Sequence, residues 1–220
     1  KMPLKTLPEW LKYLEKSQPV EIEFGLDRIS KVAKLLGLPT NFHQLDRSLD
    51  QQDCLNNNEE LTIATKVITV GGTNGKGSCV AVLDSILREA GYRVGCYTSP
   101  HLIKFNERIT INGQHSSDLD ICLAFEEINK VRKSISLSFF EFSTLAALLI
   151  MANSNLDIAM LEVGLGGRLD AVNLIDTQLS IINGVALDHQ QRIGSELDSI
   201  ARAKDASGRA GRGQIDGEGK

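Results

Sequence analysis

Residues 66–91 read KVITVGGTNGKGSCVAVLDSILREAG, and this stretch decides the class of fold. The β-branched run at 66–70 predicts a short buried strand. A glycine-rich turn follows at 71–77, and the apolar residues of 78–90 then recur at helical spacing, which predicts an amphipathic helix. Gly91 is a typical helix stop. A strand, a glycine-rich turn and a helix in this order predict a phosphate-binding unit within an α/β protein.

Strands and helices alternate along the rest of the chain. Further strands are predicted at 94–98, 109–111, 156–163 and 179–187, and further helices at 7–15, 26–36, 117–133 and 141–153. This alternation predicts a mostly parallel sheet flanked by helices on both faces. In such sheets the ligand binds beyond the carboxyl ends of the strands. The polar motifs of this chain fall at those ends, so the sequence predicts that they form one site.

Composition restricts the possible partners of the chain. Of its 220 residues, 42% are hydrophobic and 24% charged, which is typical of a globular protein with an ample core. The net charge of -4 and the lack of a basic cluster argue against nucleic acid as a partner. No apolar run reaches the roughly 18 residues of a membrane span, and no signal pattern opens the chain. The four cysteines form no C-x-x-C pair, so we expect free thiols in the cytoplasm and no zinc.

The turn at 71–78 has the composition of a phosphate-binding loop. Its backbone N–H groups can point inward, and the start of the helix adds positive potential. Lys76 is expected to reach the β- and γ-phosphates of a nucleotide, and Ser78 to approach a magnesium ion. Val70 and Gly77 depart from the strict P-loop pattern. The alternative is a tight turn with a solvent-exposed lysine.

The segment Gly72–Ser78, GTNGKGS, resembles the variant P-loop of folylpolyglutamate synthases and dihydrofolate synthases, which are relatives of the Mur peptide ligases. Other motifs of that family follow in its order: TSPHL at 98–102, NERI at 106–109, FEFST at 140–144, LEVGLGGRLDAVN at 161–173 and LDH at 187–189. The resemblance covers roughly residues 7–204. It implies a P-loop nucleotide-binding fold like the central domain of the Mur ligases.

The resemblance also implies an activity, an ATP- and magnesium-dependent ligase. ATP would phosphorylate a carboxylate, and L-glutamate would attack the acyl phosphate, giving an amide on dihydropteroate, tetrahydrofolate or both. The loop residues that would bind ATP are Thr73, Asn74, Gly75, Lys76, Gly77 and Ser78. The residues that would take part in catalysis are Lys76, His189 and Lys204.

By the same resemblance, Ser99, Glu162 and His189 match the magnesium-binding positions of the family. Each has an alternative role when it is considered alone. Glu162 could cap the amides of 164–167, His189 could be an imidazole in water, and the Ser99 hydroxyl could bond locally. Lys204 matches a lysine that is carbamylated in the family, but its neighbours differ from the family pattern, and the alternative is an ordinary solvated lysine.

A substrate pocket is implied by Phe140, Asp170 and Ala171, which match positions that contact the pterin or pteroate group. An aromatic face can stack on a flat heterocycle, and a carboxylate can accept hydrogen bonds from its N–H groups. The alternative for Phe140 is core packing, because Phe139 and Phe142 surround it in the sequence.

The organisation expected from the sequence has three parts. Residues 1–62 form N-terminal helices and a polar loop of the same domain, 63–203 form the ATP-binding domain, and 204–220 form a flexible tail. The C-terminal domain of the family is expected to be absent, so we expect this chain to be inactive by itself. We also expect a monomer. One alternative is a non-catalytic nucleotide-binding remnant of the family. Another is a Mur-type ligase that acts on cell-wall precursors.

Overall fold

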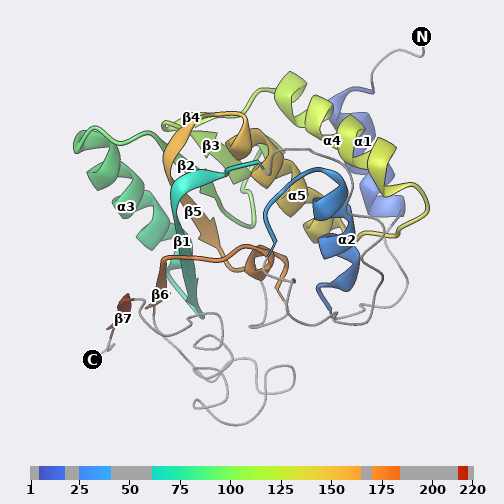
Figure 1. Cartoon of the computed structure of the whole chain (residues 1–220). Helices are drawn as coiled ribbons and strands as arrows, with labels where there is room; N and C mark the ends of the chain where they lie inside the picture. The colour runs from blue at the N-terminus through green and yellow to red at the C-terminus, as the bar shows by residue number, and fades with distance from the viewer. Residues whose placement is uncertain (1–4, 18–24, 41–60, 165–169, 184–212, 218–220) are drawn as a thin grey trace, which may run out of the picture.

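A computed structural model of the chain describes residues 5–17, 25–40, 61–164, 170–183 and 213–217. The described part is built on a seven-stranded sheet with the strand order β4-β3-β2-β5-β1-β6-β7 (Figure 1). The strands are β1 Ala64–Gly72, β2 Val94–Tyr97, β3 Ile109–Ile111, β4 Gln114–His115, β5 Leu156–Glu162, β6 Leu179–Asn183 and β7 Gly213–Gly217. The run from β2 to β7 is parallel, and β3 and β4 add an antiparallel edge. The predicted class, an α/β fold with a mostly parallel sheet, is confirmed.

Helices cover both faces of this sheet. They are α1 Leu7–Lys16, α2 Asp27–Leu35, α3 Lys76–Glu89, α4 Asp118–Arg132 and α5 Phe139–Ala152, with 3-10 turns η2 Phe105–Arg108 and η3 Ala171–Leu174. Figure 1 shows α3 on one face and the other four helices gathered on the opposite face. Among the described helices, none has the length and apolar character needed to cross a membrane.

The larger of two apolar cores lies on the face opposite α3. Trp10 of α1 is fully buried there, and its ring centroid lies 5.7 Å from that of Phe125 in α4 and 6.2 Å from that of Phe142 in α5. Aromatic rings bury the most apolar area per residue. These contacts hold α1 against α4 and α5, and residues of α1 and α2 belong to the same apolar core as residues of the sheet.

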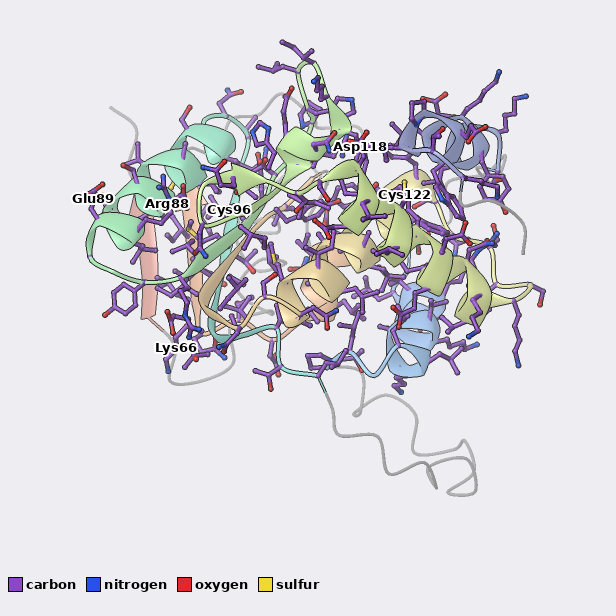
Figure 2. The ribbon with its side chains drawn as sticks, turned by 90° about the horizontal axis from the view of Figure 1, so that it is seen from above. Lys66, Arg88, Glu89, Cys96, Asp118 and Cys122 are labelled. Carbon is purple, nitrogen blue, oxygen red and sulfur yellow. The ribbon has the colours of Figure 1, made fainter. Side chains whose placement is uncertain are left out.

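The smaller core lies between α3 and the sheet. Figure 2 shows Arg88 of α3 and Cys96 of β2 beside each other in this layer. Burial, together with the nearby carboxylate of Asp84, raises the pKa of the Cys96 thiol to about 12. The thiol therefore stays protonated and packs as a small apolar group, as the sequence predicts.

Helix caps explain where two of the helices begin. Ser117 and Asp120 form the predicted capping box of α4, with the Asp120 amide donating to Ser117 Oγ at 3.1 Å. A second box, which the sequence analysis did not identify, joins Ser138 and Glu141. For this reason α5 begins at Phe139, two residues before the predicted start.

The segment 204–220 contains a strand that the sequence does not predict. Residues 213–217 pair with β6 in parallel, from Leu179 opposite Gly213 to Asn183 opposite Gly217. Hydrophobic periodicity does not indicate a strand here, because Ile215 is the only large apolar residue in this segment. Strand pairing uses backbone groups, so it does not require such a pattern.

One ion pair joins the starts of β2 and β5 and leads to a prediction about pH. The Arg93 guanidinium and the Arg93 amide both donate to the Asp157 carboxylate, with distances of 2.8–3.1 Å. These hydrogen bonds lower the pKa of Asp157 from 3.8 to about 2. A carboxyl with a lowered pKa in the folded state stabilises the fold above its unfolded pKa, and that stabilisation is lost as the pH falls toward the folded value.

Replacing Asp157 with asparagine should therefore lower Tm slightly at pH 7. The gap between the variant and the parent should narrow as the pH falls from about 4 toward 2, because Asp157 then becomes protonated in both states. Thermal unfolding followed by circular dichroism across this range measures the gap. A gap that stays constant from pH 7 to pH 3 would contradict the assignment.

Candidate nucleotide and metal site

The five parallel strands β2, β5, β1, β6 and β7 end at one edge of the sheet, and their order decides which residues meet there. In the register, Val70 of β1 lies opposite Glu162 of β5, and Tyr97 of β2 lies opposite Leu161. Gly72 of β1 lies opposite Asn183 of β6. The residues that follow β1 and β2 therefore lie beside the last residue of β5, as the parallel-sheet rule predicts.

The phosphate-loop prediction concerns the turn between β1 and α3. Helix α3 begins at Lys76, two residues earlier than predicted, because Gly75 adopts a left-handed conformation with φ of 74° and serves as its N-cap. Glycine adopts this conformation without steric cost. The first bond of the helix runs from the Cys79 amide to the Gly75 carbonyl at 2.9 Å. The amides of Lys76, Gly77 and Ser78 precede it and have no carbonyl acceptor within the helix.

The start of α3 differs from the starts of α1, α4 and α5. Each of those helices places an acidic side chain, Glu9, Asp120 or Glu141, on its own N-cap. Helix α3 has no side-chain cap and no acidic residue in its first turn. Its positive end is therefore not neutralised by its own first turn, and an anion bound there would be stabilised.

Lys76 adds a positive charge to this helix start. Its Nζ donates to the carbonyl of Gly72 at 3.1 Å, and the side chain is half-buried. The side chain thus folds back over the loop. This geometry differs from the fully solvent-exposed lysine of the alternative interpretation.

Glu162 lies next to the loop at the end of β5. Its side chain is buried and accepts a hydrogen bond from the Ser99 amide at 3.1 Å. A Cβ atom on Gly77 would lie 3.7 Å from Glu162 Oε2, so the first turn of α3 comes close to the carboxylate. Burial raises the pKa of Glu162, and the Ser99 amide and the charge of Lys76 partly oppose this. The structure thus brings Ser99, Glu162 and Lys76 together, as expected.

These residues fit a divalent cation that prefers oxygen ligands. A buried carboxylate is costly to ionise, and a cation beside it would offset that cost. Magnesium keeps several waters and often takes only one or two protein ligands in addition to substrate phosphates. Within the described ranges no group of three His, Cys, Asp or Glu side chains gathers, so a metal cage built by the protein alone is not seen there. His189 and Lys204 lie outside the described residues.

Two of the residues expected to contact the pterin, Phe140 and Asp170, lie near Tyr97. The Phe140 ring is half-buried and lies 6.0 Å from the Tyr97 ring. Asp170 is buried and accepts a hydrogen bond from the Val172 amide at 3.0 Å. Burial raises the pKa of the Tyr97 phenol, and the charge of Asp170 adds to this effect. Ala171 is also buried. Asp170 therefore has a structural role at the start of η3, and Phe140 packs against the core.

Two residues near these sites were not identified from the sequence. Asn183 Nδ2 would lie 2.8 Å from a Cβ atom on Gly75, so the amide lies against the phosphate loop. Asn183 was not recognised as a loop neighbour because it falls inside the strand predicted at 179–187, whereas β6 is described only to Asn183. Arg108 is buried and donates from Nε to His101 Nδ1 at 2.8 Å. The sequence did not indicate this hydrogen bond, because it joins two residues of the segment between β2 and β3 that come together only in the fold.

The arrangement defines a class of protein. A parallel sheet with a glycine-rich turn, an uncapped helix start and a lysine at its carboxyl edge is a P-loop nucleotide-binding α/β fold. Comparisons with known proteins refine this class. No family model matches the chain.

Individual relatives match almost the whole chain. The dihydrofolate synthase/folylpolyglutamate synthase of Escherichia coli K12 is 40% identical over 212 residues, which are 96% of this chain and 45% of that protein. The Haemophilus influenzae protein of the same name is 43% identical over 198 residues, 90% of this chain and 40% of its own length. The chain is thus homologous to the N-terminal part of the dihydrofolate synthase/folylpolyglutamate synthase family, as its motifs indicate. It spans just under half the length of these relatives.

Solved structures agree with this assignment. Escherichia coli FolC in complex with DHPP and ADP superposes with a TM-score of 0.83 at 40% identity and covers 97% of this chain and 46% of its own. The Yersinia pestis bifunctional folylpolyglutamate synthase/dihydrofolate synthase complexed with AMPPNP and Mn ion gives a TM-score of 0.82 at 40% identity. It covers 100% of this chain and 49% of its own.

Proposed function

We propose that the chain forms the nucleotide- and metal-binding part of a ligase that uses ATP to join L-glutamate to dihydropteroate, tetrahydrofolate or both. The uncapped start of α3, with Lys76 over the loop and Glu162 beside it, is the observation that carries the proposal. Relatives crystallised with ADP, or with AMPPNP and a manganese ion, support it. A solved structure of a bifunctional folylpolyglutamate synthase/dihydrofolate synthase with Mn, AMPPNP and L-glutamate bound supports the choice of amino acid.

The proposed reaction has two steps. A carboxylate oxygen of the pteroate or folate attacks the γ-phosphorus of ATP, the bond from that phosphorus to the β-phosphate oxygen breaks, and ADP leaves. The glutamate nitrogen then attacks the acyl carbon, the bond to the phosphate oxygen breaks, phosphate leaves and the nitrogen loses a proton. Both steps move charge onto phosphate oxygens, so preorganised donors accelerate them.

In this proposal separate groups of residues bind the phosphates, the metal ion and the pterin. The first-turn amides of α3 and the amino group of Lys76 hold the phosphates. Ser99 and Glu162 would hold magnesium, which supplies positive charge to the transferring phosphate. Phe140, Asp170 and Ala171 would contribute to the pterin pocket. His189 is proposed as a further metal ligand and Lys204 as a carbamylated lysine, by family resemblance.

A fusion protein tests the function. This chain, up to residue 204, can be joined to the remaining C-terminal part of the Escherichia coli relative, and ADP release measured with dihydropteroate or tetrahydrofolate as the second substrate. Turnover that depends on glutamate supports the ligase. Nucleotide binding without turnover would favour the alternative, a non-catalytic nucleotide-binding protein related to this family.

Replacing Glu162 with glutamine tests the metal site. The variant keeps the shape of the side chain but loses its charge, so magnesium should no longer strengthen nucleotide binding. We expect the affinity measured with magnesium to fall roughly tenfold, to the value measured with EDTA. A tenfold loss corresponds to about 1.4 kcal/mol of binding free energy. Isothermal titration with ATP measures both values.

Glu89 provides a matched control for this change. It is exposed in the last turn of α3, far from the loop, and is labelled in Figure 2. Glu89→Gln should leave the effect of magnesium unchanged. Full retention of that effect in Glu162→Gln would exclude Glu162 as a ligand.

A further inference from the structure

Arg108 is a buried arginine beside the candidate site, and the residues around it do not balance its charge. The residue is 9% exposed, and its Nε donates to His101 Nδ1 at 2.8 Å. Its guanidinium carbon lies 5.6 Å from the centre of the Phe105 ring and 5.5 Å from that of Phe139. Within the described ranges it forms no ion pair with a carboxylate. Burying a charge without a counter-charge costs free energy, so this guanidinium indicates a binding site for an anion.

Arg132 shows how an arginine with a purely structural role is bonded in the same helical layer. Its guanidinium also lies against an aromatic ring, with its carbon 5.8 Å from the ring centre. All three of its nitrogens donate hydrogen bonds, to Asn129 Oδ1 at 3.0 Å, the Ile135 carbonyl at 2.9 Å and the Tyr13 hydroxyl at 2.7 Å. Among the described residues Arg108 makes one hydrogen bond of this kind, from Nε, so its two terminal nitrogens can still donate to a ligand.

Two polar neighbours of Arg108 are uncharged. His101 accepts a hydrogen bond at Nδ1, so that nitrogen carries no proton and the ring supplies no negative charge. Burial raises the pKa of the Tyr97 phenol, and the charge of Arg108 partly opposes this. The phenol therefore stays protonated at neutral pH. Neither neighbour neutralises the guanidinium, whereas an anionic ligand would.

The position of Arg108 places its charge between the proposed metal site and the proposed pterin pocket. Its carbonyl accepts a hydrogen bond from the Thr98 amide at 2.9 Å, and the residue after Thr98 is Ser99, a proposed magnesium ligand. Its guanidinium lies against Phe139, which precedes Phe140 in α5. In the proposed reaction the carboxylate to be phosphorylated lies between the pterin pocket and the metal ion, which brings it next to Arg108.

We propose that Arg108 binds the carboxylate of the pteroate or folate substrate, with His101 holding its guanidinium in position. A guanidinium presents two parallel N–H donors that match the two oxygens of a carboxylate. Because Nε is already bonded to His101, the terminal nitrogens form the new pair of bonds. This assignment rests on the proposed function and adds to it the residue that distinguishes a carboxylate substrate from an uncharged pterin.

Pteroate and its carboxamide test the proposal, because they differ only in the group that Arg108 binds. Isothermal titration of the full chain in EDTA, without nucleotide, keeps metal ions and phosphate away from that group. The parent should bind pteroate about tenfold more tightly than the carboxamide, since hydrogen bonds between charged partners are the stronger ones. Arg108→Gln should bind pteroate as weakly as the carboxamide, and its affinity for the carboxamide should be unchanged.

Two results would refute the assignment. An equal loss of affinity for both ligands in Arg108→Gln would show that the arginine only stabilises the pocket. A parent that does not prefer pteroate to the carboxamide would show that no cation meets the carboxylate.

Arg132→Gln is the matched control. It removes the same group beside an aromatic ring, at a residue whose nitrogens are all bonded within the fold. It should lower Tm and leave the ratio of the two affinities unchanged, and a changed ratio would mean that the ratio follows packing rather than charge.

Arg108→Lys carries the comparison if circular dichroism shows that Arg108→Gln does not fold. Lysine keeps the charge but lacks the planar pair of donors, so pteroate should bind several-fold more weakly than to the parent. Affinity for the carboxamide should not change. Parent-like binding of pteroate by this variant would contradict the paired hydrogen bonds.

The outcome is separate from that of the proposed nucleotide site. Arg108→Gln should bind magnesium ATP as the parent does, because Arg108 is not part of the phosphate loop. Failure of nucleotide binding in the parent would refute the proposed function and leave the preference for pteroate measurable. Absence of that preference, with nucleotide binding intact, would refute the role of Arg108 alone.

Discussion

Replacing Lys76 with alanine should weaken the binding of magnesium ATP by about 10- to 100-fold. Hydrogen bonds to charged groups contribute about 1.5–3 kcal/mol, and each 1.4 kcal/mol corresponds to a factor of ten in affinity. Lys76 Nζ lies over the loop and bonds to the Gly72 carbonyl at 3.1 Å, so its charge is already positioned before a nucleotide binds. Isothermal titration at fixed magnesium concentration measures the loss.

Lys66 supplies the matched control for this prediction. It belongs to the same strand-turn-helix unit but is exposed near the start of β1, where Figure 2 labels it. Lys66→Ala removes the same charge and should leave nucleotide affinity unchanged. If both variants bind as the parent does, the loop does not hold phosphate and the proposed function fails. If both bind equally weakly, the attraction comes from overall charge.

Replacing Gly72 with alanine should destabilise the domain by about 3 kcal/mol or more, which corresponds to a fall in Tm of roughly 6–12 °C for a chain of this size. Gly72 has φ of 142°, and a Cβ atom there would overlap the carbonyl oxygen of Asn183 on the neighbouring strand. That oxygen belongs to the backbone of β6, which pairs with β1 at this residue, so it cannot move without breaking the pairing. Thermal unfolding measures the effect.

Two causes of strain are expected in Gly72→Ala: the positive φ and the overlap with the Asn183 carbonyl oxygen. Gly91→Ala separates them. Gly91 also has positive φ, 88°, but nothing lies within 4 Å of a Cβ atom there. Its replacement should cost only about 1–2 kcal/mol, the penalty of the left-handed conformation alone. A fall in Tm as large for Gly91→Ala as for Gly72→Ala would mean that the contact with Asn183 is not the dominant cause. Gly72→Ala should also weaken nucleotide binding, because Lys76 bonds to the carbonyl of the same residue.

The sequence predicted the order of strands and helices well where hydrophobic periodicity was strong. Helix α4 was predicted almost to the residue because Ser117 and Asp120 form a recognisable box. Helix boundaries were less accurate where a cap depends on backbone conformation. The left-handed Gly75, which starts α3 at Lys76, is an example, because glycine occurs in many turns and its φ is not evident from its identity.

The convergence of Ser99 and Glu162 was predicted from a general rule about parallel sheets, but their contact was not. The bond from the Ser99 amide to the Glu162 carboxylate depends on strand order, with β5 between β1 and β2. Strand order is decided by packing of the whole domain and leaves little trace in any one segment. The same strand order places Asn183 on the other side of β1, opposite Gly72.

Phe140 was open to two interpretations, stacking on a heterocycle or packing in the core. The structure shows it half-buried against Tyr97, with a ring carbon 2.5 Å from the position of a Cβ atom on Gly164. Only the packing is visible in the described residues, and contact with a pterin stays a prediction.

The short distance between Gly77 and Glu162 has a thermodynamic consequence. Because no side chain separates the first turn of α3 from the carboxylate, an anion at the helix start and a cation at Glu162 would attract each other directly. Linkage then requires that each ligand raise the affinity of the other by the same factor. In the proposed function, heterotropic cooperativity of this kind would make the free ion concentration a determinant of how much nucleotide the domain binds.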